Sequence, residues 1–186
     1  MSAALLVIDV QESFRHRPTW QPAEIPAFSD AVNRLVAASR ASGVPVVRVF
    51  HLEDEGPFDP STGFVVPLEG IDAYADHRVN KRVHSALVGT DLLPWLKARG
   101  IDRLIISGIR TEQCCETTAR HASDLGFKVD YVTEATLTFP IRHSNGREYS
   151  TAEIKERTEL VLTGRFATIR TVAEIEAELQ GQTMQA

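Results

Sequence analysis

Two hydrophobic patterns alternate along the chain: amphipathic stretches with helical spacing and short β-branched runs. One junction between them occurs four times, as an amphipathic stretch, then a glycine, then a β-branched run. The glycines are Gly43, Gly100, Gly126 and Gly164. Because glycine caps the end of a helix without a Cβ penalty, each junction predicts a helix that stops just before a strand. The repeated order predicts a parallel sheet with crossover helices.

Three helices are predicted individually. The first covers about residues 27–42. Its apolar face consists of Phe28, Ala31, Val32, Leu35 and Val36. The second ends near Arg99. Its apolar face consists of Leu92, Leu93 and Leu96. Thr171 and Glu174 have the spacing of a capping box, so we expect the last helix to begin at Thr171.

Six short runs predict strands. They cover about residues 4–8, 44–47, 77–80, 103–106, 129–132 and 166–169. Together with the helices, they predict an α/β fold in which residues 1–186 form a single domain. Its sheet is expected to be doubly wound, with about six mostly parallel strands and helices on both faces, in three layers. Two long loops are expected, at residues 52–75 and 136–150, with Pro140, Asn145 and Gly146 in the second.

Composition excludes several classes of protein. Hydrophobic residues make up 43% of the chain and charged residues 24%, which is neither disordered nor membrane-like. A net charge of -5 argues against a nucleic-acid partner. The apolar run before Asp9 is too short for a signal sequence, and no other stretch approaches membrane-spanning length. Cys114 and Cys115, the only cysteines, are adjacent and poorly placed to form a disulfide. A cytoplasmic location is therefore predicted.

Residues with chemical potential fall where the predicted strands end. Asp9 follows the first strand, His51 the second and Lys81 the third. The fourth strand leads through residues 107–111 into a helix that begins near Cys114. Because open parallel sheets bind ligands beyond the carboxyl ends of their strands, an acid, an amine and a thiol are expected to meet at one edge.

This combination suits a cysteine nucleophile. A cysteine in the first turn of a helix meets free N–H groups and the positive end of the helix dipole, and both favour the thiolate. Asp9 is expected to take the thiol proton, and Lys81 to hold Asp9 in place. Each residue also has a plainer interpretation: a small buried hydrophobe, a helix cap and a solvated charge. Cys115, one position further round the helix, is expected to face the sheet.

Three blocks of sequence resemble the isochorismatase-like cysteine hydrolases, a family that includes nicotinamidases and N-carbamoylsarcosine amidohydrolases. Residues 5–14 (LLVIDVQESF) look like the family's opening strand with its catalytic Asp. Residues 80–92 (NKRVHSALVGTDL) look like its lysine block. Residues 107–120 (SGIRTEQCCETTAR) have the G-x-x-T-x-x-C spacing of its nucleophile motif. The order and spacing of the three blocks extend the similarity over nearly the whole chain.

The resemblance implies a catalytic triad of Asp9, Lys81 and Cys114. It also implies a cis peptide between Ile109 and Arg110, and an oxyanion hole formed by the backbone N–H groups of Arg110 and Cys114. It implies a six-stranded parallel sheet and assembly into a homo-oligomer, a dimer or tetramer. Residues 140–150 are a candidate for a contact between subunits or for a lid over the pocket. The substrate-binding wall is predicted to include Gln11, Phe14, His51 and Phe139.

The predicted function is hydrolysis of a small amide, ureido or carbamoyl C–N bond through a thioester, with a small molecule as the partner and no cofactor. Nicotinamidases carry an Asp-x-His metal cluster after the second strand, but here that stretch is Val49-Phe50-His51, so no metal is predicted. One alternative is vinyl-ether hydrolysis of the isochorismatase type, which would need Asp9 but tolerate loss of Cys114. The other is a flavodoxin-like binding module. The single glycine after the fourth strand, Gly108, makes a nucleotide-binding version unfavourable.

Overall fold

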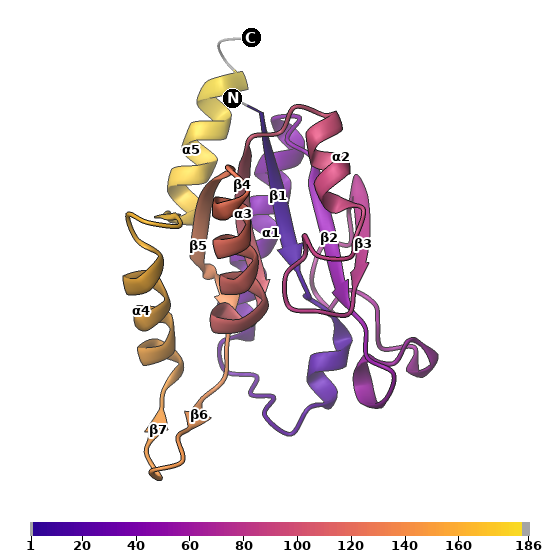
Figure 1. The fold of residues 1–186 in the computed structure, drawn as a ribbon, viewed down its shortest axis with the longest axis vertical. Coiled ribbons are helices and arrows are strands. Elements are labelled where there is room, and N and C mark those ends of the chain that lie inside the picture. The colour runs from indigo at the N-terminus through magenta and orange to yellow at the C-terminus, as the bar shows by residue number, and fades with distance from the viewer. Residues whose placement is uncertain (1, 184–186) are drawn as a thin grey trace.

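A computed structural model describes residues 2–183 and contains a six-stranded, entirely parallel sheet (Figure 1). Its strand order is β3-β2-β1-β4-β5-β8. The strands are β1 (Ala3–Ile8), β2 (Val46–His51), β3 (His77–Lys81), β4 (Arg103–Ile109), β5 (Lys128–Leu137) and β8 (Thr168–Ile169). The chain starts in the middle of the sheet, builds outward to β3 and then returns past β1 to β4. The predicted α/β fold class is confirmed.

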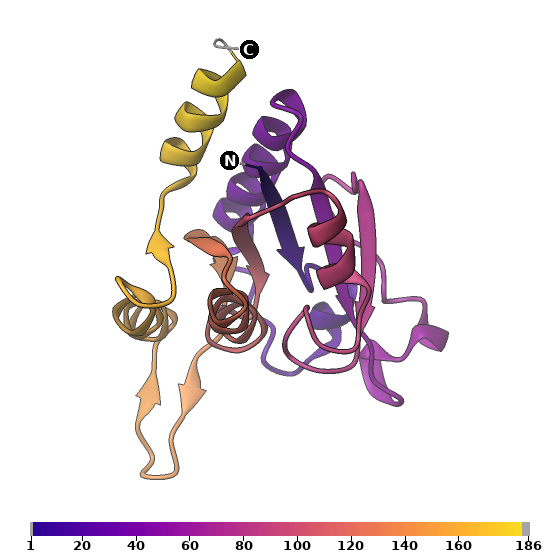
Figure 2. The same ribbon diagram turned by 45° about the horizontal axis from the view of Figure 1, so that its top comes forward.

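Helices cover both faces of the sheet (Figure 2). α1 (Ile25–Ala41) and α5 (Val172–Thr183) pack on one face. α2 (Leu92–Ala98), α3 (Glu116–Asp124) and α4 (Thr151–Leu162) lie on the other. Successive residues of a strand point to opposite faces, so Leu5 and Val7 join the core under α1 while Leu6 and Ile8 join the core under α2 and α3. No helix in residues 2–183 is long and apolar enough to cross a membrane.

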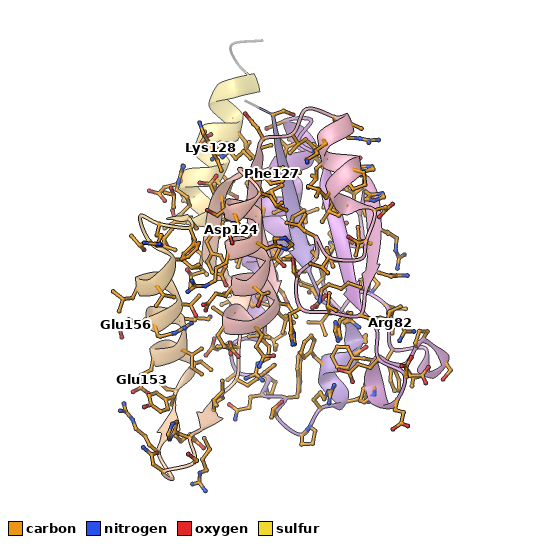
Figure 3. The ribbon with its side chains drawn as sticks, viewed as in Figure 1. Arg82, Asp124, Phe127, Lys128, Glu153 and Glu156 are labelled. Carbon is orange, nitrogen blue, oxygen red and sulfur yellow. The ribbon has the colours of Figure 1, made fainter. Side chains whose placement is uncertain are left out.

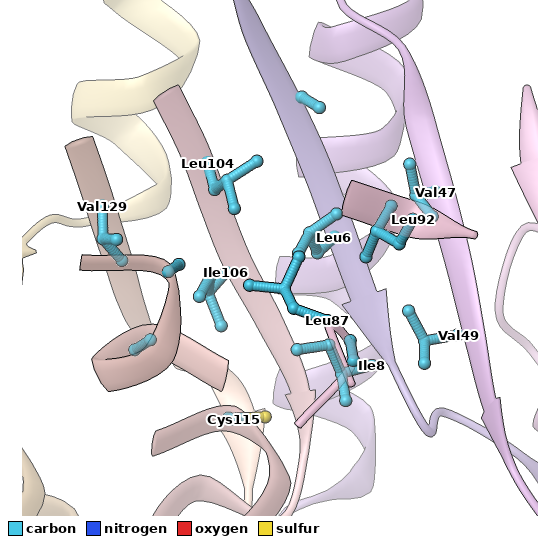
Figure 4. Packing of buried hydrophobic residues seen from close by; sticks show 14 of the residues in the cluster. Leu6, Ile8, Val47, Val49, Leu87, Leu92, Leu104, Ile106, Cys115 and Val129 are labelled. Carbon is cyan, nitrogen blue, oxygen red and sulfur yellow. The ribbon is translucent and has the colours of Figure 1, made fainter. Parts of the chain in front are cut away.

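The core under α2 and α3 joins four neighbouring strands. Figure 4 shows Leu6, Val47, Leu104 and Val129, one from each strand, with Leu92 of α2 beside Leu6 and Val47. Almost every residue of β1, β2 and β4 is buried. A parallel sheet covered on both faces requires near-continuous apolar strands, which accounts for the uninterrupted β-branched runs in the sequence.

The predicted turns and caps are also found. Gly43 and Gly100 close their helices with φ values of 68° and 63°, in the left-handed region. At the start of α5, the Thr171 hydroxyl accepts a hydrogen bond from the Glu174 amide at 3.2 Å. The Glu174 carboxylate accepts one from the Thr171 amide at 2.8 Å. This is the expected capping box.

The prediction of a simple loop at residues 136–150 is wrong. β5 continues to Leu137, and the segment then forms an antiparallel ribbon of β6 (Ile141–Arg142) and β7 (Glu148–Tyr149). Asn145-Gly146 lies in its turn, which is a strong hairpin signal when short strands flank it. Figures 1 and 2 show this ribbon projecting away from the sheet. It leads into α4, which Ser150 and Glu153 cap with a further capping box.

The loop at residues 52–75 holds two 3-10 turns, Gly56–Phe58 and Pro60–Thr62. Near its end, Pro67 forms an isolated antiparallel bridge with Gln11. The loop thereby passes across the carboxyl end of β1, where the 3-10 turn Glu12–His16 begins. It closes one side of the edge at which Asp9 lies.

Candidate active site

Two backbone features are unusual at the end of β1: the conformation of Asp9 and the close approach of Gly108 to Ile8. Asp9 has φ 53° and is the only described residue other than glycine with a positive φ. Such a conformation costs about 1–3 kcal/mol and occurs preferentially at functional sites. Opposite it, Gly108 of β4 approaches so closely that an added Cβ would lie 2.1 Å from the Ile8 carbonyl oxygen. This contact holds the chain after β4 against Asp9, and Cys114 lies six residues further along.

Lys81 connects the residues at this edge. Its Nζ lies 2.8 Å from Asp9 Oδ2, 3.2 Å from His51 Nδ1 and 3.4 Å from Cys114 Sγ. Because an ammonium group only donates hydrogen bonds, the Nδ1 of His51 must be an acceptor here. The Lys81 and Asp9 side chains are 0% and 1% exposed. The three strand ends and the thiol therefore do meet, as the sequence indicated.

Cys114 lies in a short π-helical turn, Thr111–Cys115, that runs directly into α3. The residue is only 7% exposed but borders a cavity. Cys115 is completely buried in the core between α3 and the sheet, the side that it was predicted to face (Figure 4). The peptide bond between Ile109 and Arg110, just before this turn, is cis. Of the two thiols, Cys114 is the one placed beside Lys81.

The surroundings of Cys114 oppose the thiolate form that the sequence led us to expect. Burial, followed by the negative charge of Asp9, raises the pKa of Cys114 to about 12. Burial also raises the pKa of Asp9, while Lys81 and the Cys114 thiol act in the opposite direction. Burial and the charge of Asp9 both oppose the thiolate that the start of a helix was expected to favour. Desolvation and a carboxylate at close range thus favour the neutral form of the Cys114 thiol.

Two polar groups nearby complete the electrostatics. His51 has its pKa lowered to about 4, first by burial and then by Lys81, so its ring is neutral near pH 7. Asp9 Oδ2 is occupied by Lys81, but Oδ1 is buried and has no hydrogen-bond partner among the described residues. A buried carboxylate oxygen without a partner is costly, and such groups mark functional sites. This oxygen is available to accept a proton.

A cavity of about 370 Å³ opens onto Cys114. Phe14 and His51, both predicted for the wall, line it. The wall also includes Phe58, whose ring meets Phe14 edge-on at 4.9 Å, and Arg17, whose guanidinium lies 4.8 Å from the Phe58 ring. Arg17 pairs with Glu53 at 2.8 Å, also in the wall. The cavity is thus small, partly aromatic and charged at one side.

Gln11 and Phe139 do not line this cavity. The Gln11 side chain accepts a hydrogen bond from the His51 amide at 2.8 Å and donates to the His51 carbonyl at 3.1 Å, so it fixes the end of β2. Phe139 is 1% exposed and lies behind the wall, 6.4 Å from the Phe14 ring. Both side chains are buried beside the cavity wall instead of facing the cavity. Gln11 positions His51, and Phe139 packs near Phe14.

Several residues of the wall escaped the sequence analysis, and His84 is the most notable. Its Nδ1 lies 3.7 Å from Cys114 Sγ. The residue belongs to the lysine block, three positions after Lys81, so its chain position was a usable signal. Arg17, Glu53 and Phe58 come from irregular segments that the sequence pattern does not fix. In the part of the chain that the structure describes, no three His, Cys, Asp or Glu side chains are grouped to hold a metal ion.

A larger cavity, of about 530 Å³, lies at the opposite end of the sheet. Arg103 and Lys128, the first residues of β4 and β5, border it together with Phe127. Figure 3 shows Phe127 and Lys128 at the end of the sheet away from Arg82, the residue after Lys81. Among the described residues, no cysteine or histidine borders this cavity, so the smaller one is the candidate active site.

Comparison with known proteins gives a consistent result. The sequence model described as "Isochorismatase domain" matches residues 3–173. A putative isochorismatase from Burkholderia xenovorans LB400, known from a crystal structure, shares 34% identity with a TM-score of 0.88, covering 97% of this chain and 88% of that one.

Two sequence relatives extend the comparison. The uncharacterised isochorismatase family protein YrdC of Bacillus subtilis (strain 168) is 28% identical, over 92% of this chain and 93% of its own. Nicotinamidase 3 of Arabidopsis thaliana is 31% identical, over 74% of each.

Proposed function

We propose that this chain, which belongs to the isochorismatase family of hydrolases, cleaves a small amide, ureido or carbamoyl C–N bond with Cys114 as the nucleophile. The observation behind the proposal is that the buried Lys81 Nζ lies within 3.4 Å of both Asp9 and the sulfur, two groups that border a small cavity. A relative named nicotinamidase supports an amide as the bond cleaved.

Acylation begins from the neutral thiol. As Sγ attacks the substrate carbonyl carbon, the thiol proton passes to Asp9, whose Oδ1 has no other partner. Lys81 remains beside the sulfur and stabilises the negative charge that develops there. The raised pKa of Cys114 is compatible with this order of events, because the thiolate need only exist in the transition state.

The carbonyl oxygen becomes an oxyanion in the tetrahedral intermediate. We assign its stabilisation to the backbone N–H groups of Arg110 and Cys114, on either side of the turn that holds the sulfur. Donors placed for the oxyanion are commonly worth about 10²–10³-fold in rate each. Asp9 then returns its proton to the leaving nitrogen, the C–N bond breaks, and a thioester remains on Cys114. Water hydrolyses the thioester and restores the thiol.

The test is release of ammonia or amine from a panel of small amides, ureido acids and carbamoyl compounds. We expect turnover of at least one member by the wild-type protein and loss of turnover in Cys114→Ala. Cys115→Ala is the matched control, because it removes the neighbouring, buried thiol and leaves the cavity unchanged. Turnover of an isochorismate-type vinyl ether that survives Cys114→Ala would replace this proposal with the Asp9-dependent alternative.

Assembly into a homo-oligomer is a second part of the proposal. The β6–β7 ribbon projects from the body with Ile141 37% exposed, and an isolated two-stranded ribbon is only marginally stable in water (Figure 1). A second copy covering this ribbon would supply the missing contacts. Light scattering after size-exclusion chromatography should show a dimer or tetramer, and Ile141→Asp should shift it toward monomer. A monomeric wild-type protein at micromolar concentration would refute this part.

A further inference from the structure

His84 is the only cavity-lining histidine that contacts the sulfur of Cys114. It lies on the segment after β3, three residues beyond Lys81, and its Nδ1 is 3.7 Å from Sγ. That contact is the only hydrogen bond that its ring makes within residues 2–183. The residue is exposed, so its ring can be reached by water from the cavity. The steps of acylation described above leave this imidazole without a task.

His51, the other histidine of the wall, is not equivalent to His84. The two rings are nearly parallel, at an angle of 4° with centroids 6.4 Å apart. The Nδ1 of His51 already accepts a hydrogen bond from Lys81, and its other nitrogen lies 3.7 Å from Glu53. His84 alone presents a ring nitrogen to the sulfur while remaining open to the cavity. Position and accessibility therefore single out His84.

Thioester hydrolysis poses a different problem from acylation. The attacking water enters from the cavity, where the leaving group has departed. Asp9 also borders this cavity, but it is 0% exposed and its Oδ2 is held by Lys81. His84 borders the same cavity, is exposed, and contacts the sulfur through Nδ1. A base that activates water must reach it directly or through one further water, and His84 satisfies this condition.

We infer that His84 is a catalytic residue of the second half-reaction, the general base that activates water against the thioester. Water loses a proton to the imidazole as its oxygen forms a bond to the acyl carbon. The C–S bond then breaks, and the imidazolium returns the proton to Sγ across the 3.7 Å contact. The products are a carboxylic acid and the neutral thiol, so atoms and charge balance without an added reactant. The inference rests on the proposed thioester mechanism.

The experiment uses p-nitrophenyl acetate as the acyl donor, because its leaving group needs no proton. Stopped-flow absorbance follows p-nitrophenolate, and intact-mass spectrometry follows acetyl-enzyme. In His84→Gln we expect a burst of p-nitrophenolate within about threefold of wild type. We expect the steady phase to slow by about 10²-fold or more, with acetyl-Cys114 accumulating. Added imidazole should accelerate the loss of acetyl from acetylated His84→Ala, followed by intact-mass spectrometry after unreacted p-nitrophenyl acetate has been removed. His143→Gln, on the projecting ribbon, is the matched control and should behave as wild type.

Two results would overturn the inference. A steady phase unchanged in His84→Gln would show that another group activates the water. A burst and a steady phase reduced by the same factor would show that His84 only positions Cys114. Failure of the underlying mechanism looks different: Cys114→Ala would then give the same burst as wild type, or wild type would form no acetyl-enzyme.

Discussion

The two ends of the sheet each hold a buried cluster of charges, and they differ in how completely the charges are paired. At the amino end, Arg103 of β4 bonds to Asp130 and, through two nitrogens, to Glu178 of α5. Arg170 adds a further bond to Glu178 at 3.1 Å. These guanidinium partners lower the pKa of Glu178. This cluster stabilises the ionised forms of its members.

At the carboxyl end, pairing is incomplete. Asp9 has one ammonium partner and one buried oxygen without a partner, and burial raises its pKa. Burial, followed by the charge of Asp9, raises the pKa of Cys114 beside it. Both clusters contain a buried acid bonded to a base, so an ion pair alone does not identify a functional site. The comparison teaches that an unsatisfied, pKa-raised acid next to a nucleophile indicates chemistry, whereas a saturated pair indicates structure.

The largest expected effect comes from removing the unsatisfied acid. Asp9→Asn keeps the size of the side chain and a hydrogen-bond acceptor for Lys81 but cannot take a proton. We expect kcat/KM for the best amide of the panel to fall by about 10²–10⁴-fold, the usual contribution of a general base. Asp130→Asn is the control at the other end of the sheet. Asp9→Asn activity within threefold of wild type would contradict the role of Asp9.

Removing an acid from the saturated cluster should have the opposite outcome. Asp130→Asn takes one carboxylate from Arg103, which is only 9% exposed, although Glu178 remains. We expect the free energy of unfolding in urea to fall by about 2–4 kcal/mol, while kcat/KM stays within twofold. A variant with wild-type stability and impaired turnover would mean that the amino-end cluster is coupled to the active site.

Acid should affect the activity that depends on Asp9 and the stability that depends on Glu178 at different pH values. Asp9 must be ionised to act as a base, and its pKa is raised, so activity should begin to fall at a pH above the ordinary carboxyl value of about 4. Glu178 has a lowered pKa, so its contribution to stability is present above its unfolded value and is lost only as pH falls through the lower, folded one. A pH–rate profile measured beside circular dichroism should show activity falling while the fold persists. Coincident loss of both would contradict this separation.

The smallest predicted effect concerns a positioning residue. Gln11→Ala removes the hydrogen bonds that fix His51 at the end of β2 but touches neither the sulfur nor the cavity. We expect kcat/KM to fall by about threefold to tenfold, since lost side-chain hydrogen bonds commonly cost about 0.5–1.5 kcal/mol. Gln11→Glu retains an acceptor for the His51 amide but turns a buried carboxylate oxygen toward the His51 carbonyl, so it is expected to be no more active than Gln11→Ala. A loss as large as that of Asp9→Asn would make Gln11 part of the chemistry.

Much of the fold and the meeting of Asp9, Lys81 and Cys114 could be predicted because both depend on local rules. Glycine caps and β-branched runs set the order of elements, and parallel strands bring their carboxyl ends to one edge. The cavity wall could not be predicted in the same way. Phe58 and Arg17 reach it from irregular segments, whose paths depend on contacts such as the bridge between Gln11 and Pro67.

The raised pKa of Cys114 could not be predicted for a related reason. The helix start is visible in the sequence, and its effect on a thiol is favourable but modest. Burial to 7% exposure and the charge of Asp9 arise only from tertiary packing, and they act in the opposite direction. The same packing places His84 beside the sulfur, a contact at which its position three residues after Lys81 hinted.

The central claim is that Cys114 rests as a neutral thiol and that Asp9 removes its proton during attack. The most direct measurement is a pH titration of the cysteine ¹³Cβ chemical shift in a Cys115→Ala background, with and without Asp9→Asn. We expect a protonated Cys114 throughout the neutral range when Asp9 is present. In Asp9→Asn it predicts a lower thiol pKa together with lost turnover, because the charge that opposes the thiolate is also the catalytic base. A Cys114 thiolate already present at pH 7 beside an intact Asp9 would contradict it.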